Sequence, residues 1–169
     1  MNRSTAVAFP TLILLVVFQS SVLTVLPLIE VVIQPVMLAA IAWGMLRGLM
    51  DGLIWGFIGG YLLDLFSVGP WGSQPIALMI TIVFAVWVVS TLPMNRFWLP
   101  GVLGGLCAVM NLLILGAIVQ VSPFGNHWPS MPSLTAYFVV QGTAMILIYW
   151  SLFLLRQILY PPEVTGTGF

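Results

Sequence analysis

WGMLRGLMDGLIWGFIGGYLLDLFSVGPWGS, from Trp43 to Ser73, is the stretch that decides how the chain folds. Its glycines recur every four residues and the next step of the series is a carboxylate; the set is Gly44, Gly48, Gly52, Gly56, Gly60 and Asp64. Residues four apart on a helix lie nearly above one another, so these positions predict a stripe of bare backbone. Glycine costs roughly 1 kcal/mol against alanine in a helix in water, whereas lipid forces a backbone to satisfy its own hydrogen bonds. The stretch therefore predicts a membrane helix that a neighbouring helix can approach closely.

The composition of the whole chain supports the same class of protein. Of its 169 residues, 61% are hydrophobic and 5% are charged, and the mean hydropathy is +1.16. A soluble domain would carry about 25% charged residues, so an integral membrane protein is predicted. The net charge is zero and no basic cluster is present, which argues against nucleic-acid binding. Cys107 and His127 are the single cysteine and the single histidine, so we expect neither a metal site nor a cofactor.

Hydrophobic runs and the residues that interrupt them predict six transmembrane helices in one domain covering residues 1–169. The expected spans are 6–26, 28–46, 48–66, 75–92, 98–121 and 134–155, with a tail over 157–169. Pro35 is expected in the first turns of the second span, and the turn after Arg47 must be very tight. The fifth span also carries small residues, from Gly101 to Ala108, and is the expected partner of the glycine stripe.

The arginines predict the orientation of these spans. An even number of spans places both termini on one side, together with the turns that hold the basic residues Arg3, Arg47, Arg96 and Arg156. Basic residues concentrate on the cytoplasmic side, so both termini and the 157–169 tail are expected there. Asp64 then lies near the outer end of the third span. The expected location is the cytoplasmic membrane, as a multi-pass protein in contact with lipids.

Asp64 and the Arg47–Asp51 pair are the charged candidates for function. An ionisable group in a span usually faces protein or water. Asp64 either hydrogen-bonds the turn that contains Pro70 and Gly72, as a cap for the next helix, or contacts a ligand or partner. Arg47 and Asp51 are four residues apart and are expected to pair at the cytoplasmic boundary, or to form a cytoplasmic docking contact.

Uncharged polar residues and tryptophans complete the candidates. Gln19, Asn111, Gln120 and Gln141 lie inside or near spans and are expected to bond across helices; only a cluster of them would indicate a polar cavity. Trp43, Trp98, Trp128 and Trp150 are expected to be interface anchors. His127 lies in the longest predicted loop, 122–133. No arrangement typical of a nucleophilic, metal or phosphate-binding enzyme is present in the sequence, so we expect no enzymatic activity.

From Gln34 to Leu78 the pattern resembles the rod shape-determining protein MreD family. The matching features are the proline that opens the second span, a glycine-rich helix that ends in Leu62-Leu63-Asp64, and the turn Gly69-Pro70-Trp71-Gly72. The length and the six-span layout are also similar to that family. The resemblance implies a fold like that of the substrate-binding subunits of energy-coupling-factor transporters.

The resemblance also implies a function. It is that of a non-enzymatic scaffold in the bacterial inner membrane that binds MreC, with MreB, RodA and a class B penicillin-binding protein as further partners in peptidoglycan synthesis and rod shape. The alternative is a substrate-capturing subunit of an energy-coupling-factor transporter, with Asp64, Asn111 and His127 lining an outer-face pocket.

The sequence favours the scaffold over the capturing subunit. A scaffold needs close-packing stripes and exposed apolar faces, which are abundant, whereas a pocket needs several convergent polar groups on the outer half. Whether the stripe contacts another span of this chain, a second copy in a homodimer, or the helix of MreC stays open at this point.

Overall fold

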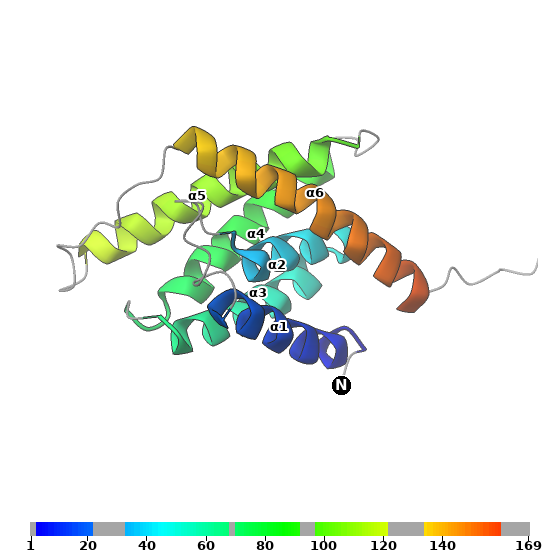
Figure 1. Cartoon of the computed structure of the whole chain (residues 1–169), viewed down its shortest axis with the longest axis horizontal. Coiled ribbons are helices and arrows are strands. Elements are labelled where there is room, and N and C mark those ends of the chain that lie inside the picture. Colours follow the sequence, from blue (N-terminus) through cyan, green and yellow to red (C-terminus); the bar gives the residue numbers. More distant parts are fainter. Residues whose placement is uncertain (1–2, 22–32, 68–69, 92–96, 122–133, 160–169) are drawn as a thin grey trace, which may run out of the picture.

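The computed structural model describes residues 3–21, 33–67, 70–91, 97–121 and 134–159 of the chain (Figure 1). These residues form six α-helices: α1 (Arg3–Ser21), α2 (Pro35–Arg47), α3 (Leu49–Leu65), α4 (Ser73–Thr91), α5 (Leu99–Val121) and α6 (Leu134–Leu159). The predicted all-α class is therefore confirmed for the described part. Three of the helices, α4, α5 and α6, are long and apolar enough to cross a membrane.

Several helix ends differ from the predicted ones, each for a local reason. The second helix begins at Pro35 rather than Leu28, because a proline at the first helical position loses no hydrogen bond; residues 28–32 lie outside the described ranges. The fourth begins at Ser73, two residues before the predicted start. The last helix continues to Leu159, so Gln157 is helical and does not belong to a tail.

The predicted glycine stripe does not lie on one helix. Gly48 has a φ of +98°, a conformation that favours glycine, and it separates α2 from α3. Gly44 therefore belongs to α2, while Gly52, Gly56 and Gly60 belong to α3. The turn at Gly48 folds the two helices back on each other, and a Cβ added at Gly52 would lie 2.6 Å from the Gly44 Cα.

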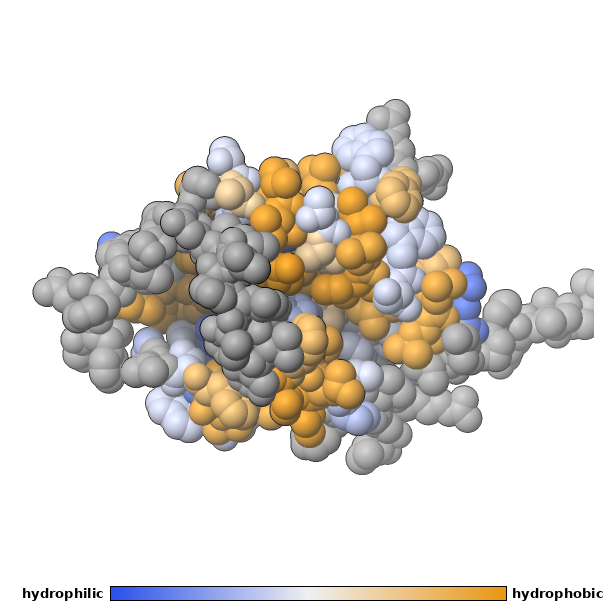
Figure 2. Space-filling model, in the orientation of Figure 1, coloured by the Kyte–Doolittle hydropathy of each residue, from blue (hydrophilic) through white to orange (hydrophobic). Residues whose placement is uncertain are grey.

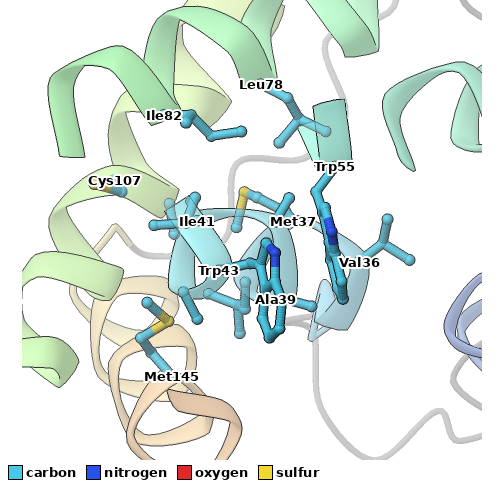
Figure 3. Packing of buried hydrophobic residues seen from close by; sticks show 14 of the residues in the cluster. Val36, Met37, Ala39, Ile41, Trp43, Trp55, Leu78, Ile82, Cys107 and Met145 are labelled. Carbon is cyan, nitrogen blue, oxygen red and sulfur yellow. The ribbon is translucent and has the colours of Figure 1, made fainter. Parts of the chain in front are cut away.

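The centre of the bundle is α2, not the stripe on α3. Every residue from Pro35 to Gly44 is buried, and α2 packs against each of the other five helices. In Figure 3, Leu78 and Ile82 of α4 reach this helix from one side and Met145 of α6 from the other. At 13 residues α2 is about 20 Å long, which is shorter than a hydrocarbon core of about 30 Å. Because side chains of α1 and α6 supply hydrogen-bond acceptors at its start, that end of α2 need not reach the surface of a membrane.

Two tryptophans hold α2 and α3 together. Trp43 and Trp55 stack with their ring centroids 4.7 Å apart, and both side chains are fully buried (Figure 3). The expectation that Trp43 anchors an interface is therefore wrong. The reason is that other helices enclose α2, so the Trp43 side chain cannot reach the headgroup region of a membrane.

The glycines of α3 pack against α4, which corrects the prediction that the fifth span is their partner. A Cβ at Gly60 would lie 2.5 Å from the Pro75 Cα, and a Cβ at Gly56 would meet the tip of Ile82. No contact joins α3 and α5 within the described residues. The two helices are neighbours along the chain, and the short turn between them places them side by side.

The small residues of α5 instead form a second seam, with α6. A Cβ at Gly105 would lie 2.8 Å from the Phe138 carbonyl oxygen, and one at Gly101 would lie 3.0 Å from that of Gly142. Numbering on the two helices runs in opposite directions along this contact, so α5 and α6 are antiparallel. Close backbone approach is what small residues at a membrane-helix interface permit.

Large apolar side chains cover the outside of the bundle. In Figure 2, hydrophobic residues dominate the described part of the visible face, and strongly hydrophilic residues lie toward its edges. Outward-facing hydrophobics recur at helical spacing, for example Ile76, Ile80, Val83 and Trp87 on α4. The N-terminal end of α1 and the C-terminal end of α6 both lie toward the right of Figure 1.

Candidate functional site

Asp64 holds the turn between α3 and α4. Its Oδ2 accepts a hydrogen bond of 2.6 Å from the Gly72 N–H, and its Oδ1 accepts one of 3.3 Å from the Gln74 N–H. The side chain is 95% buried, with 5% of its surface exposed. A carboxylate at the start of α4 also interacts favourably with the helix dipole. Of the two interpretations of Asp64, the structure shows the capping role.

The neighbouring turn residues have matching roles. Gly72 has a φ of +86°, which places its N–H toward the carboxylate and is readily available only to glycine. The Pro70 carbonyl oxygen accepts a hydrogen bond of 3.2 Å from the Ser73 N–H. Both predicted turn residues thus belong to the same hydrogen-bonded turn as Asp64.

Arg47 and Asp51 pair across the α2–α3 turn, as predicted. The Arg47 Nε lies 3.2 Å from the Asp51 Oδ2. Both side chains are partly exposed, so screening by solvent keeps the contribution of the pair small. The pair bridges the break at Gly48 and so links the end of α2 to the first turn of α3.

A second polar arrangement, which we call the α2-start cluster, consists of Gln19, Gln34, Tyr137 and Gln141. The Gln141 Oε1 on α6 accepts a hydrogen bond of 3.4 Å from the Gln34 N–H, and the Gln19 Oε1 on α1 accepts one of 3.4 Å from the Val36 N–H. The first N–H groups of any helix have no acceptor within the helix. Two glutamines from different helices therefore supply the acceptors for the start of α2.

Asn111 on α5 has a buried Oδ1 atom without a hydrogen bond, and the residue is 1% exposed. The hydroxyl of Tyr137, a residue that is 3% exposed, makes no well-formed hydrogen bond but interacts with the Gln141 side chain. A third such atom, Nε1 of Trp55, lies in the tryptophan stack. Buried polar groups without partners are rare in native proteins, so each calls for an explanation.

Two of the three residues predicted to line an outer-face pocket lie in the described part of the chain. Asp64 is on α3 and Asn111 is on α5, and those helices are not in contact within the described residues. The Asp64 oxygens are used by the turn. His127 lies outside the described residues.

Sequence reasoning named two members of the α2-start cluster, Gln19 and Gln141, together with the buried Asn111, but not Tyr137 or the role of Gln34. A signal was present, because Tyr137 and Gln141 are four residues apart and so share one face of a helix. Nothing in the sequence shows that the same face meets the start of α2. Gln120, the fourth polar residue named, is exposed.

Comparisons with protein-family models, curated proteins and solved structures found no match. Among the described residues, no group of three or more His, Cys, Asp or Glu side chains could hold a metal ion. The class that the fold itself defines is an all-helical bundle with three helices able to cross a membrane.

Proposed function

We propose that the protein is a non-enzymatic scaffold of the bacterial cell-elongation complex, embedded in the cytoplasmic membrane as six spans and binding MreC. The proposal rests on the difference between the interior and the exterior of the bundle. Inside, Asp64, the charged candidate for a ligand or partner contact, stabilises a turn. Outside, the outward faces of the helices carry large apolar side chains. Such faces suit helix–helix association in lipid.

The resemblance of the 34–78 stretch to the MreD family supplies the partners in this proposal. MreC is the principal one, and MreB, RodA and a class B penicillin-binding protein are the others. The buried glycines of the stripe are not available to any of them, because α4 and α2 already cover Gly44, Gly52, Gly56 and Gly60. A partner helix therefore has to dock on an outward face, and a homodimer would have to use such a face as well.

The helix arrangement supports the proposed topology. The N-terminal end of α1 and the C-terminal end of α6 lie on the same side of the bundle (Figure 1). The Arg47–Asp51 pair and Arg156 are at helix ends, where charged groups reach the headgroup region of a membrane. This agrees with termini in the cytoplasm.

The capturing-subunit alternative is less well supported. Its predicted pocket is lined by Asp64, Asn111 and His127, whereas Asp64 and Asn111 lie on helices that are not in contact within the described residues. With Asp64 engaged in the turn, the proposed scaffold is preferred.

The decisive experiment is co-purification with MreC combined with site-specific crosslinking. A photo-crosslinking residue is placed at one outward position on each of α1, α3, α4 and α6, namely Leu14, Tyr61, Val83 or Leu147, all of which are exposed. We expect MreC to co-purify and to be crosslinked from one face only. Matched positions inside the bundle, such as Leu78 and Met145, should give no crosslink to MreC. A folded protein that retains no MreC in mild detergent would refute the proposal.

A further inference from the structure

The last turns of α6 carry aromatic side chains beside an arginine, and together with one ring that precedes α5 they form what we call the α6-end cluster: Phe97, Tyr149, Trp150, Phe153 and Arg156. The Trp150 ring stacks on that of Phe97, with the ring centroids 5.7 Å apart. It meets the rings of Phe153 and Tyr149 edge-on, with the centroids 5.5 Å and 6.1 Å away. The Arg156 guanidinium lies close enough to Tyr149 to interact with it electrostatically. These interactions join all five residues at one end of the bundle.

Two groups in this cluster are hydrogen-bond donors without an acceptor in the described part of the chain. They are the Arg156 guanidinium and the Tyr149 hydroxyl, neither of which forms a hydrogen bond or an ion pair with the residues that the structure describes. The carboxylates in the described ranges are engaged elsewhere, because Asp51 pairs with Arg47 and Asp64 holds the α3–α4 turn. A guanidinium has five N–H donors and no acceptor, so its natural partner is an anion.

The position of the cluster along α6 indicates which anion is at hand. The segment Leu134–Gln157 has 24 residues and is apolar enough to cross a membrane, and Arg156 is its penultimate residue. A helix of that length is about 36 Å long, so crossing a hydrocarbon core of about 30 Å places its last turn at the level of the lipid phosphates. Trp150 and Phe97 are exposed and lie nearer the acyl chains, at a depth that suits aromatic rings.

We infer that the α6-end cluster binds an anionic phospholipid. Arg156 and Tyr149 donate hydrogen bonds to its phosphate, because the planar guanidinium matches two phosphate oxygens. The exposed rings of Trp150 and Phe97 pack against the glycerol and the upper acyl chains. An anionic headgroup is preferred to a zwitterionic one because the cluster holds an arginine and no carboxylate that would bind a second cation. This inference rests on the membrane embedding in the proposed function and does not depend on MreC.

The test measures lipid binding to the purified full-length protein in a mild non-ionic detergent by native mass spectrometry. Phosphatidylglycerol is titrated into the protein, and phosphatidylcholine with the same acyl chains is the comparison. We expect phosphatidylglycerol to bind about fivefold more tightly, which is the effect of one arginine on an anionic headgroup. Equal affinities for the two lipids overturn the proposal.

Substitutions test the two donors. Arg156→Gln should weaken phosphatidylglycerol binding about tenfold, and Tyr149→Phe by a smaller factor, because each removes a hydrogen bond to a charged group. Arg156→Lys keeps the charge without the planar fork, so its affinity should lie between those of the wild type and Arg156→Gln. Arg47→Gln and Tyr61→Phe make the same chemical changes outside the cluster and should bind like the wild type. Wild-type affinity in Arg156→Gln, or an equal loss in Arg47→Gln, overturns the site.

Two further measurements separate the lipid from other occupants. Phosphatidylglycerol with brominated acyl chains should quench tryptophan fluorescence, and Trp150→Phe should remove more of that quenching than Trp71→Phe in the exposed α3–α4 turn. Equal effects place the lipid elsewhere and overturn the proposal. Inorganic phosphate at the same concentration should not displace the lipid, because it lacks the acyl chains that meet the rings. Displacement would assign the site to free phosphate and overturn the lipid assignment.

These measurements are separate from the test of the scaffold function. MreC takes no part in them, so a failure to bind phosphatidylglycerol leaves the scaffold proposal standing. A failure of MreC to co-purify, in turn, leaves the lipid affinities unchanged.

Discussion

At the scale of single residues, Asp64 shows how a carboxylate in an apolar chain can serve the fold. Both of its oxygens accept N–H groups from the start of α4, and the residue is almost fully buried. A hydrogen bond to a charged group contributes more than one between neutral groups. The two hydrogen bonds from the turn therefore offset the free-energy cost of burying the charge.

We predict that Asp64→Asn destabilises the protein by about 1.5–3 kcal/mol, because the amide turns one of the two acceptors into a donor facing an N–H. Reversible unfolding in mixed micelles measures the loss. Asp51→Asn is the control and should cost under about 1 kcal/mol, since its partner Arg47 is partly exposed. Equal losses for the two variants would show that the Asp64 charge does not organise the turn.

At the scale of helices, the α3–α4 seam depends on what each glycine faces. Gly60 lies against the backbone of Pro75, which cannot move without shifting α4, whereas Gly56 lies against the flexible tip of Ile82. The two positions look alike in the sequence but differ in how well the neighbour can adjust.

Gly60→Ala is therefore predicted to destabilise more than Gly56→Ala, with overpacking costing about 1–3 kcal/mol at the rigid site. Thermal unfolding of the two variants provides the comparison. Ile82→Val removes the terminal methyl that Gly56→Ala would meet, so the double variant should recover part of the Gly56→Ala loss. The same substitution should not rescue Gly60→Ala, and a rescue there would contradict the assigned contacts.

The start of α2 offers a second prediction at this scale. Gln141→Met keeps a similar side-chain volume and removes the oxygen that accepts the Gln34 N–H. Losing a hydrogen bond worth on the order of 1 kcal/mol should speed hydrogen exchange of that amide roughly fivefold. Gln120→Met, at an exposed position of α5, is the control. Unchanged exchange at Gln34 would mean that Gln141 does not cap the helix.

At the scale of the whole molecule, the bundle is built around a short buried helix. The other five helices enclose α2, so its sequence is apolar on every side. Glutamine side chains of α1 and α6 accept hydrogen bonds from the N–H groups at its start. The outward faces of α3 to α6 remain available to lipid or a partner.

The proposed topology is tested by labelling single cysteines in intact cells, in a Cys107→Ala background. Gln157→Cys should react only after the cytoplasm is made accessible, whereas Trp71→Cys in the exposed α3–α4 turn should react from outside. Reaction of both from the same side would rule out the six-span arrangement with cytoplasmic termini.

Much of the local structure could be predicted from the sequence because it depends on short-range chemistry. Arg47 and Asp51 pair at a spacing of four, and Asp64 lies eight residues before the turn glycine that it binds. Helix ends were less accurate: α6 continues past Arg156 because nothing in Gln157 to Leu159 breaks a helix.

By itself, the sequence determined the helical class, the apolar exterior and the residues of the α3–α4 turn, because hydrophobicity and local hydrogen bonding act over a few residues. Only the tertiary structure decided which helices meet. It packed the stripe glycines of α3 against α4 and α2 rather than α5, made α2 the centre, and brought Gln19 and Gln141 to the start of α2. Small residues allow close approach to any neighbour, so the choice among neighbours depends on the packing of the whole bundle.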